Sequence, residues 1–307
     1  MSPDSSRRKV LKQLAGSALL LGGAPAMAAA AQFNQAADAD RQEEATRKKL
    51  KGNINHSVCR WTATYLTLEE QCELMKDMGL KAIDLLKPDE WPVIKKYGLE
   101  CSMCYIRGEV SLTKGFNNPA YHAQLVKEYL ETIPLVAEAG FKNLICFSGN
   151  RNGMDDKTGL DNCVAGLKKI MPLAEKHGVI IQMELFNSRV DHPDYMADKS
   201  AWGVELCKKL GSPNFKLLFD IYHMQVNEGD IIHSIRDNHQ YFGHYHVAGV
   251  PGRHEPEDTQ ELNYPAVMKA IVATGFKGYV AQEFIFTGTT KSAKTSALRK
   301  AVKVCDV

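Results

Sequence analysis

Acidic and imidazole side chains interrupt four apolar segments in the second half of the chain. Burying an ionised carboxylate costs several kcal/mol unless it is paired or bound to a cation. A divalent metal ion would remove the repulsion among three such carboxylates. A set of mostly oxygen ligands with one nitrogen favours Mn²⁺ or Mg²⁺, with Co²⁺ or Zn²⁺ as alternatives. The predicted ligands of one such ion are Glu184 in QMELF, Asp220 in LLFDIY, His246 in HYHVAG and Glu283 in VAQEF.

Each of these residues also has a structural interpretation when it is considered alone. Glu184 could form a salt bridge, Asp220 could cap a following helix, and His246 could be a hydrogen-bonded core histidine. His244 shares a face with His246, because residues two apart in a strand do, and only one of them need bind a metal. The four ligand-type residues taken together favour the metal site.

The elements that carry these residues predict an α/β fold. Short β-rich segments alternate with amphipathic helical segments, which implies a parallel sheet, and eight strands close into a (β/α)8 barrel, or TIM barrel. An open doubly wound sheet is the alternative, but no Gly-rich phosphate turn follows the first strand. We expect a single domain over residues 53–307. The predicted strands are 53–58, 82–86, 100–105, 143–147, 180–185, 216–220, 241–247 and 278–284, and the predicted helices are 68–78, 91–97, 119–139, 159–177, 199–210, 231–239 and 264–273.

In a barrel of this kind, the active-site residues lie at the C-terminal ends of the strands. The four ligand candidates all lie at such ends. By position, we also expect His56, at the end of the first strand, to contact substrate and Trp61 to form an apolar wall. Thr67 and Glu70 form a capping box pattern at the start of the first helix. Glycines that suit left-handed helix caps follow six helices, at positions 79, 98, 140, 178, 211 and 275.

Several segments resemble the hydroxypyruvate isomerase branch of the xylose isomerase-like barrels. These segments are ELFNSRVDHPDY, FDIYHMQVNEGD, GHYHVAGVPGRHEP, ELNYPAVMKAI and YVAQEF, and the resemblance covers most of residues 53–290. It implies metal ligands at Glu184, Asp220, His246 and Glu283, and substrate contacts from His223 and Arg253. The sequence departs from the family pattern at His246, where Gln often stands, and at Val190, where the family usually has an acidic residue that is here displaced to Asp191.

The resemblance also implies that two of the ligand glutamates transfer a proton next to a carbonyl group. A metal ion stabilises the enediolate that forms when the proton leaves, and a carboxylate removes that proton. We predict Glu184 and Glu283 as the catalytic pair of an isomerase or epimerase acting on a keto-sugar or small keto-acid. Arg253 could instead form a loop salt bridge with Glu255. A metal-dependent lyase of the inosose dehydratase type and a non-catalytic sugar-binding protein are the alternative functions.

The loop after the last strand raises the question of a phosphate group on the substrate. Residues 286–291, with Lys291 at their end, could bind a phosphate through backbone N–H groups. The preferred interpretation is a flexible Gly/Thr loop, since acidic residues in the loop after the seventh strand would oppose a dianion. We therefore expect an unphosphorylated substrate.

Composition limits the partners of the protein. The chain has 307 residues, 44% of them hydrophobic and 24% charged, with a net charge of +2. This composition is ordinary for a globular protein, and the sequence has no clustered basic face of the kind that nucleic-acid binding needs. We expect a small-molecule substrate and no nucleic acid, and a homo-oligomer is left open. The eight cysteines lie mostly in apolar runs, which favours buried thiols.

Residues 1–30 resemble a twin-arginine export signal. Arg7 and Arg8 precede a short apolar run at 19–21, and small residues follow at 26–30. This order is typical of a cleaved signal, and the run is too short and Gly-rich to cross about 30 Å of hydrocarbon stably. The sequence therefore predicts a periplasmic or otherwise exported protein without stable membrane insertion, with a flexible leader at 31–52. A disordered basic tail is the alternative.

Replacing Arg7 and Arg8 together by Lys tests the export prediction. We expect the double variant to accumulate as an uncleaved precursor in the cytoplasm, because the twin-arginine route depends on this pair. Cell fractionation followed by immunoblotting measures the distribution, with Lys12→Arg as the matched control. Normal export of the double variant would contradict the prediction.

Overall fold

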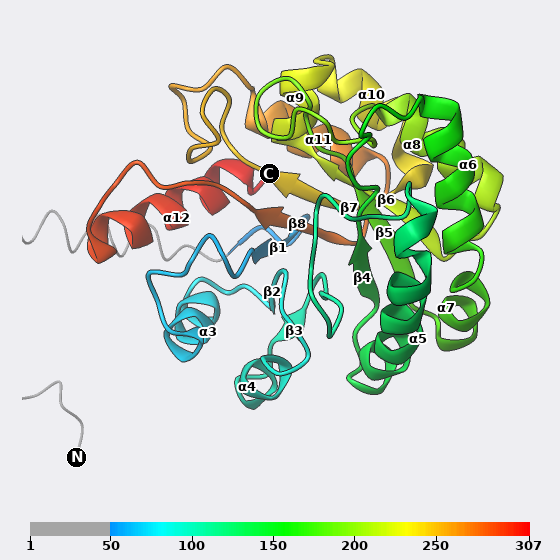
Figure 1. The fold of residues 1–307 in the computed structure, drawn as a ribbon. Coiled ribbons are helices and arrows are strands. Elements are labelled where there is room, and N and C mark those ends of the chain that lie inside the picture. The colour runs from blue at the N-terminus through cyan, green and yellow to red at the C-terminus, as the bar shows by residue number, and fades with distance from the viewer. Residues whose placement is uncertain (1–49) are drawn as a thin grey trace, which may run out of the picture. The chain divides into compact units, whose positions relative to one another are not determined.

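Eight parallel strands form the centre of the protein in the computed structural model, which describes residues 50–307 (Figure 1). The strands are β1 (Asn55–Val58), β2 (Ala82–Ile83), β3 (Glu100–Cys101), β4 (Asn143–Cys146), β5 (Ile180–Glu184), β6 (Phe215–Asp220), β7 (Phe242–Val247) and β8 (Tyr279–Gln282). Six of them pair in the order β1-β8-β7-β6-β5-β4, and β2 pairs with β3. Parallel bridges from Cys59 to Asp84 and from Cys104 to Leu144 join the two sheets. The strands therefore form a closed ring, which confirms the predicted (β/α)8 barrel.

Helices cover the outside of the ring of strands (Figure 1). Segments with one or two helices connect the end of each strand to the start of the next, and the last helix follows β8, so the strands all run in one direction and their C-terminal ends meet at one mouth. The helices are α3 (Leu68–Asp77), α4 (Trp91–Lys96), α5 (His122–Glu138), α6 (Asp156–Leu167), α7 (Met171–His177), α8 (Ser200–Leu210), α9 (Ile221–Asn227), α10 (Ile231–Asn238), α11 (Tyr264–Ala273) and α12 (Lys291–Cys305), with 3₁₀ turns η1 (Pro119–Tyr121) and η2 (His239–Tyr241).

The observed elements differ from the predicted ones in five places. The strand predicted at 82–86 is only two residues long, because Leu85 adopts a left-handed φ of 58° and interrupts the ladder. The strand predicted at 100–105 is equally short. The helix predicted at 159–177 is two helices, α6 and α7, and Pro172 lies in the first turn of α7, where a proline fits best. Helices α9 and α12 were not predicted.

The predicted capping box and cap glycines are confirmed. Thr67 accepts a hydrogen bond from the backbone of Glu70, whose side chain accepts one from the backbone of Thr67, so the capping box at α3 is complete. Gly178 and Gly211 end α7 and α8 with φ of 66° and 67°, a conformation that other residues adopt at a cost. The other four predicted cap glycines also have positive φ.

The prediction of buried thiols is also confirmed, since all eight cysteines are free and buried. The predicted signal at 1–30 and nearly all of the predicted leader at 31–52 lie outside the described residues. Among residues 50–307, the structure has no helix with the length and apolar character needed to span a membrane.

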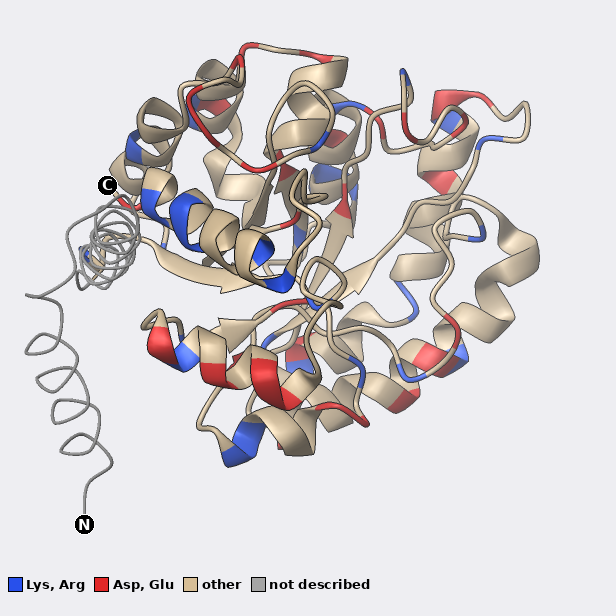
Figure 2. Ribbon diagram, turned by 90° about the vertical axis from the view of Figure 1, so that its left-hand side faces the viewer, with Lys and Arg blue, Asp and Glu red and all other residues tan. Residues whose placement is uncertain are grey.

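Ion pairs join α12 to α3 on the face of the barrel shown in Figure 2, where the ribbon of α12 carries basic residues and that of α3 carries acidic ones. Lys291 Nζ lies 2.6 Å from Glu70 Oε1, and Arg299 pairs with Asp77. Lys291, the residue considered for phosphate binding, therefore has a carboxylate partner at the start of α12. The unphosphorylated substrate stays a prediction.

Candidate active site

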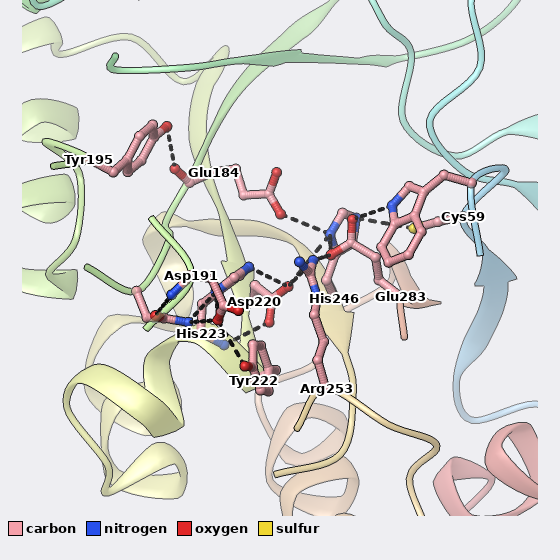
Figure 3. A network of polar contacts seen from close by, with 12 residues as sticks. Cys59, Glu184, Asp191, Tyr195, Asp220, Tyr222, His223, His246, Arg253 and Glu283 are labelled. Carbon is pink, nitrogen blue, oxygen red and sulfur yellow. Dashed lines mark hydrogen bonds and ion pairs between the residues drawn. The ribbon is translucent and has the colours of Figure 1, made fainter. Parts of the chain in front are cut away.

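The four predicted ligand residues converge at the mouth of the barrel (Figure 3). Their strands place them there, because Glu184 and Asp220 end β5 and β6, His246 lies near the end of β7, and Glu283 directly follows β8. One ligand atom from each residue lies within 4.8 Å of the others. None of the four residues is more than 3% exposed. The structure thus brings together, in a buried cluster, residues that are up to 99 positions apart in the sequence.

His246 stands at the centre of this cluster and uses its two ring nitrogens differently. Its Nδ1 lies 3.0 Å from Glu184 Oε1 and 3.1 Å from Glu283 Oε2, and it lies 4.0 Å from Asp220 Oδ2. Its Nε2 lies 3.0 Å from Oδ1 of Asp84 on the opposite side of the ring. Metal-binding histidines commonly donate their second N–H to a carboxylate, which fixes the ring orientation. Nδ1 is therefore the nitrogen that could bind a metal ion.

Asp84 is a site residue that the sequence analysis missed. It is fully buried just after β2, and its Oδ2 lies 3.0 Å from Nε2 of His244 and accepts a hydrogen bond from Ser102. Burial would raise the pKa of Asp84, but His244 and His246 outweigh it and hold this pKa below its ordinary value. His244 therefore contacts Asp84, while His246 alone reaches the cluster. The available signal was a carboxylate inside the apolar run KAIDLL.

Asp220 serves in two ways at once. Its Oδ1 accepts a hydrogen bond from the backbone N–H of His223 at 3.0 Å and so caps the start of α9. Its Oδ2 is buried, has no hydrogen-bond partner and faces the cluster. The capping role and the ligand role, considered as alternatives from the sequence, are therefore compatible, because each uses a different oxygen.

The pKa shifts show how the protein alone accommodates three buried carboxylates. Burial and the charge of Glu283 raise the pKa of Glu184 and that of Asp220. Burial would also raise the pKa of Glu283, but His246 and Arg253 hold it well below its usual range. Burial opposes the charge on His246, yet Glu283 among its neighbours raises the His246 pKa well above normal. Three carboxyl groups thus share two cationic side chains, and the two with raised pKa values hold their protons more readily than usual.

The donor set fits a divalent cation. Three carboxylates and one imidazole nitrogen surround a common point, and a buried oxygen of Asp220 there lacks a partner. Oxygen-rich sets of this kind suit divalent ions that prefer hard ligands. Glu184, Asp220, His246 and Glu283 are the residues that would hold such an ion.

Arg253 reaches the cluster from the loop after β7. Its Nη2 lies 2.6 Å from Glu283 Oε2 and 4.0 Å from Asp220 Oδ2. Its guanidinium lies over the rings of Trp61 and Tyr222, at 5.2 and 5.6 Å from their centroids. The alternative salt bridge between Arg253 and Glu255 is wrong, because Glu255 instead accepts hydrogen bonds from Thr287.

Trp61 and His223 also lie at the cluster. Trp61 donates from Nε1 to Glu283 Oε1 at 2.9 Å, so the indole contributes a hydrogen bond as well as the expected apolar wall. His223 Nε2 is buried without a hydrogen-bond partner, 3.9 Å from Asp220 Oδ2. Burial and the nearby Arg253 lower the pKa of His223 well below its usual value, which favours a neutral ring.

His56 does not join the cluster, so the prediction that it contacts substrate is wrong. Its Nε2 lies 3.7 Å from Oδ1 of Asp306, just beyond the end of α12. Side chains alternate along a strand, and the neighbouring Ser57 contacts Ser102 inside the barrel. His56 therefore points outward to the helix layer.

Comparison with known proteins places this barrel in a family. Residues 68–303 match the model of the Xylose isomerase-like TIM barrel family. The chain belongs to this family.

Two relatives match shorter parts of the barrel. The chain is 38% identical over 111 residues to 2-oxo-tetronate isomerase of Cupriavidus necator, covering 36% of this chain and 42% of that protein. It is 29% identical over 129 residues to hydroxypyruvate isomerase of Escherichia coli, covering 42% of this chain and 49% of the relative. These matches span less than half of the length of each relative.

A solved structure supports the same fold over nearly its whole length. The apo form of 3-keto-D-glucoside 4-epimerase from E. coli superposes with a TM-score of 0.69 at 18% identity. The superposition covers 81% of this chain and 99% of that structure. At this level of identity the likeness concerns the fold.

Replacing Asp84 by Asn tests its place in this xylose isomerase-like site. The amide keeps the shape of the carboxylate but loses its charge, so it orients His246 less firmly. We expect the affinity for Mn²⁺ to fall about 10- to 100-fold, the range for lost outer-shell partners. Isothermal titration of the metal-free protein measures the change.

The matched control is Asp161→Asn, which alters a surface ion pair of α6 with Lys157 and Lys209. It should leave the affinity for Mn²⁺ unchanged. Equal affinities of the folded Asp84→Asn variant and the wild type would show that Asp84 does not support the site.

Proposed function

We propose that this protein is a metal-dependent isomerase or epimerase of a keto-sugar or small keto-acid. The single observation that carries the proposal is the placement of two buried glutamates around one point. Glu184 and Glu283 approach the same nitrogen of His246 from different strands, at 3.0 and 3.1 Å. Paired carboxylates at the mouth of a barrel are suited to moving a proton between two positions of a bound substrate.

The reaction would proceed through proton transfer by these two side chains. One glutamate removes a proton from the carbon next to the carbonyl group, which leaves an enediolate, and the other returns a proton. Delivery to the opposite face of the same carbon gives an epimer, and delivery to the neighbouring carbon gives an isomer. Arg253 and His223 would bind substrate oxygens, and Trp61 would hold Glu283 in place through its N–H.

Mn²⁺ or Mg²⁺ is the proposed cofactor, with Co²⁺ and Zn²⁺ as alternatives. When bound by Glu184, Asp220, His246 and Glu283, such an ion would polarise the carbonyl group and stabilise the negative charge that develops on it. The names of the relatives support the proposed activity, since they include a 2-oxo-tetronate isomerase and a hydroxypyruvate isomerase. The export pattern at residues 1–30 supports a periplasmic location for the reaction.

The proposed function is tested by comparing the wild type with the Glu283→Gln variant. The measured quantity is the exchange of deuterium from solvent into a panel of keto-sugars and keto-acids. Glutamine keeps the shape of the side chain and one oxygen but cannot accept the proton. We expect exchange to fall by at least ~10², the scale of lost general-base catalysis. Mass spectrometry of the recovered substrate measures exchange, and analysis of the products separates epimerisation and isomerisation from loss of water by a lyase.

Glu205→Gln is the matched control, because Glu205 is exposed on α8 away from the mouth. Its exchange rate should equal that of the wild type. Near wild-type exchange by metal-loaded Glu283→Gln would mean that another residue moves the proton. Absence of exchange by the wild type with every substrate would favour the sugar-binding alternative.

A further inference from the structure

Asn187 lies beside the active site, three residues after Glu184 in the loop that follows β5. It is fully buried, and none of the roles described above uses it. Its side chain contacts both Asp191 in the same loop and His223 in α9. Asn187 thus connects the loop to a histidine of the mouth whose Nε2 is buried without a partner.

The orientation of the Asn187 amide follows from its hydrogen bonds. Oδ1 accepts from the backbone N–H groups of Val190 and Asp191, each at 3.0 Å. Nδ2 donates to Asp191 Oδ2 at 2.6 Å. The reversed amide would place its NH₂ group against two N–H donors and its oxygen against a carboxylate. Only the observed orientation satisfies all three contacts.

The amide orientation determines where His223 carries its proton. Asn187 Nδ2 lies 2.7 Å from His223 Nδ1. Two nitrogens at this distance cannot both present a hydrogen to each other, so Nδ1 must offer its lone pair to the second N–H of the amide. The single proton of the neutral ring then resides on Nε2.

The surrounding groups hold this arrangement in place. Asp191 Oδ2 also accepts a hydrogen bond from the hydroxyl of Tyr222 at 2.8 Å, so the carboxylate that anchors Asn187 is itself anchored. The His223 ring packs against Phe186, with 4.9 Å between the ring centroids. The Nε2 atom lies 3.9 Å from Asp220 Oδ2, on the side of the carboxylate cluster.

We propose that Asn187 is a positioning residue that fixes His223 as the Nε2–H tautomer, so that His223 presents a hydrogen-bond donor to an oxygen of the substrate. The partner at this point of the site is then a hydroxyl or carbonyl oxygen, and His223 does not accept a proton there. The role toward substrate rests on the proposed function, whereas the tautomer is a property of the protein alone.

An exchange of two side chains tests the proposal with little change in shape. In the double variant Asn187→Asp/Asp191→Asn, the amide and the carboxylate swap places and the net charge is unchanged. The carboxylate introduced at position 187 would keep accepting from the two backbone N–H groups and from the new amide, but it would offer His223 an acceptor. His223 should then carry its proton on Nδ1 and lose its donor toward the substrate.

Nitrogen NMR of the full chain, labelled with ¹⁵N-histidine and loaded with Mg²⁺, reads the tautomer directly. The signal of His223 is identified by its absence from His223→Gln. We expect protonated Nε2 and bare Nδ1 in the wild type, and the reverse in the swap variant. A wild-type His223 that is protonated on Nδ1, or a swap variant with an unchanged pattern, would overturn the proposal. The wild-type spectrum decides even if the swap variant does not fold.

Kinetics test the consequence for the substrate. We expect kcat/KM of the swap variant to fall about 10²-fold, as for other lost donors at a reacting oxygen, with metal content unchanged. The control is Asn214→Asp, whose amide bonds to Val179 O before β6, and it should alter neither readout. A reversed tautomer with wild-type kcat/KM would refute the donor role. A wild type with the expected tautomer but no turnover would count against the proposed function and leave the role of Asn187 in setting the tautomer supported.

Discussion

The burial of three carboxylates around one histidine nitrogen is the constraint on which this site depends. Glu184, Asp220 and Glu283 are almost inaccessible to solvent, and each lies at the end of a different strand of a closed barrel. In the protein alone, His246 and Arg253 offset part of their charge, and burial raises the pKa of Glu184 and of Asp220. Such an arrangement is costly unless a cation shares the site. A purely structural role for the cluster would not account for that cost.

The groups around the cluster fix the direction in which its polar atoms point. Asp84 turns Nδ1 of His246 to the centre by binding the opposite nitrogen. The backbone of α9 occupies one oxygen of Asp220 and leaves the other facing the cluster. Asn187 contacts one ring nitrogen of His223, as Asp84 contacts one ring nitrogen of His246. In each case the contact orients the other ring nitrogen. The site therefore extends well beyond its four candidate ligands, and these outer residues decide what each inner atom can bind.

The positions of the three carboxylates could be predicted from the sequence by a simple rule about parallel barrels. An apolar run predicts a strand, and a carboxylate at the C-terminal end of that strand is expected at the mouth of the barrel. This rule identified Glu184, Asp220 and Glu283. The same rule failed at His56, because the mouth end of β1 is Val58 and the alternation of side chains turns His56 outward. Helix α12 was not predicted, although its buried residues Leu298, Ala301, Val302 and Cys305 recur at helical spacing.

The contacts of Asp84 and Asn187 could not be predicted because their partners are distant in the chain. Asp84 meets His246 at a separation of 162 residues, and nothing local in KAIDLL distinguishes a carboxylate that binds histidines from one that forms an ion pair. The separation between Asn187 and His223 is 36 residues, and their contact depends on the pairing of β5 with β6. Only the closed barrel brings these pairs together.

The central claim is that the carboxylate cluster binds a divalent cation. Its most direct test is an anomalous difference map from crystals of the protein grown with Mn²⁺, with data collected on both sides of the manganese absorption edge. The account predicts a manganese peak in contact with Glu184, Asp220, Glu283 and Nδ1 of His246. A map without a peak there, with Nδ1 of His246 still paired directly with Glu184 and Glu283, would contradict it.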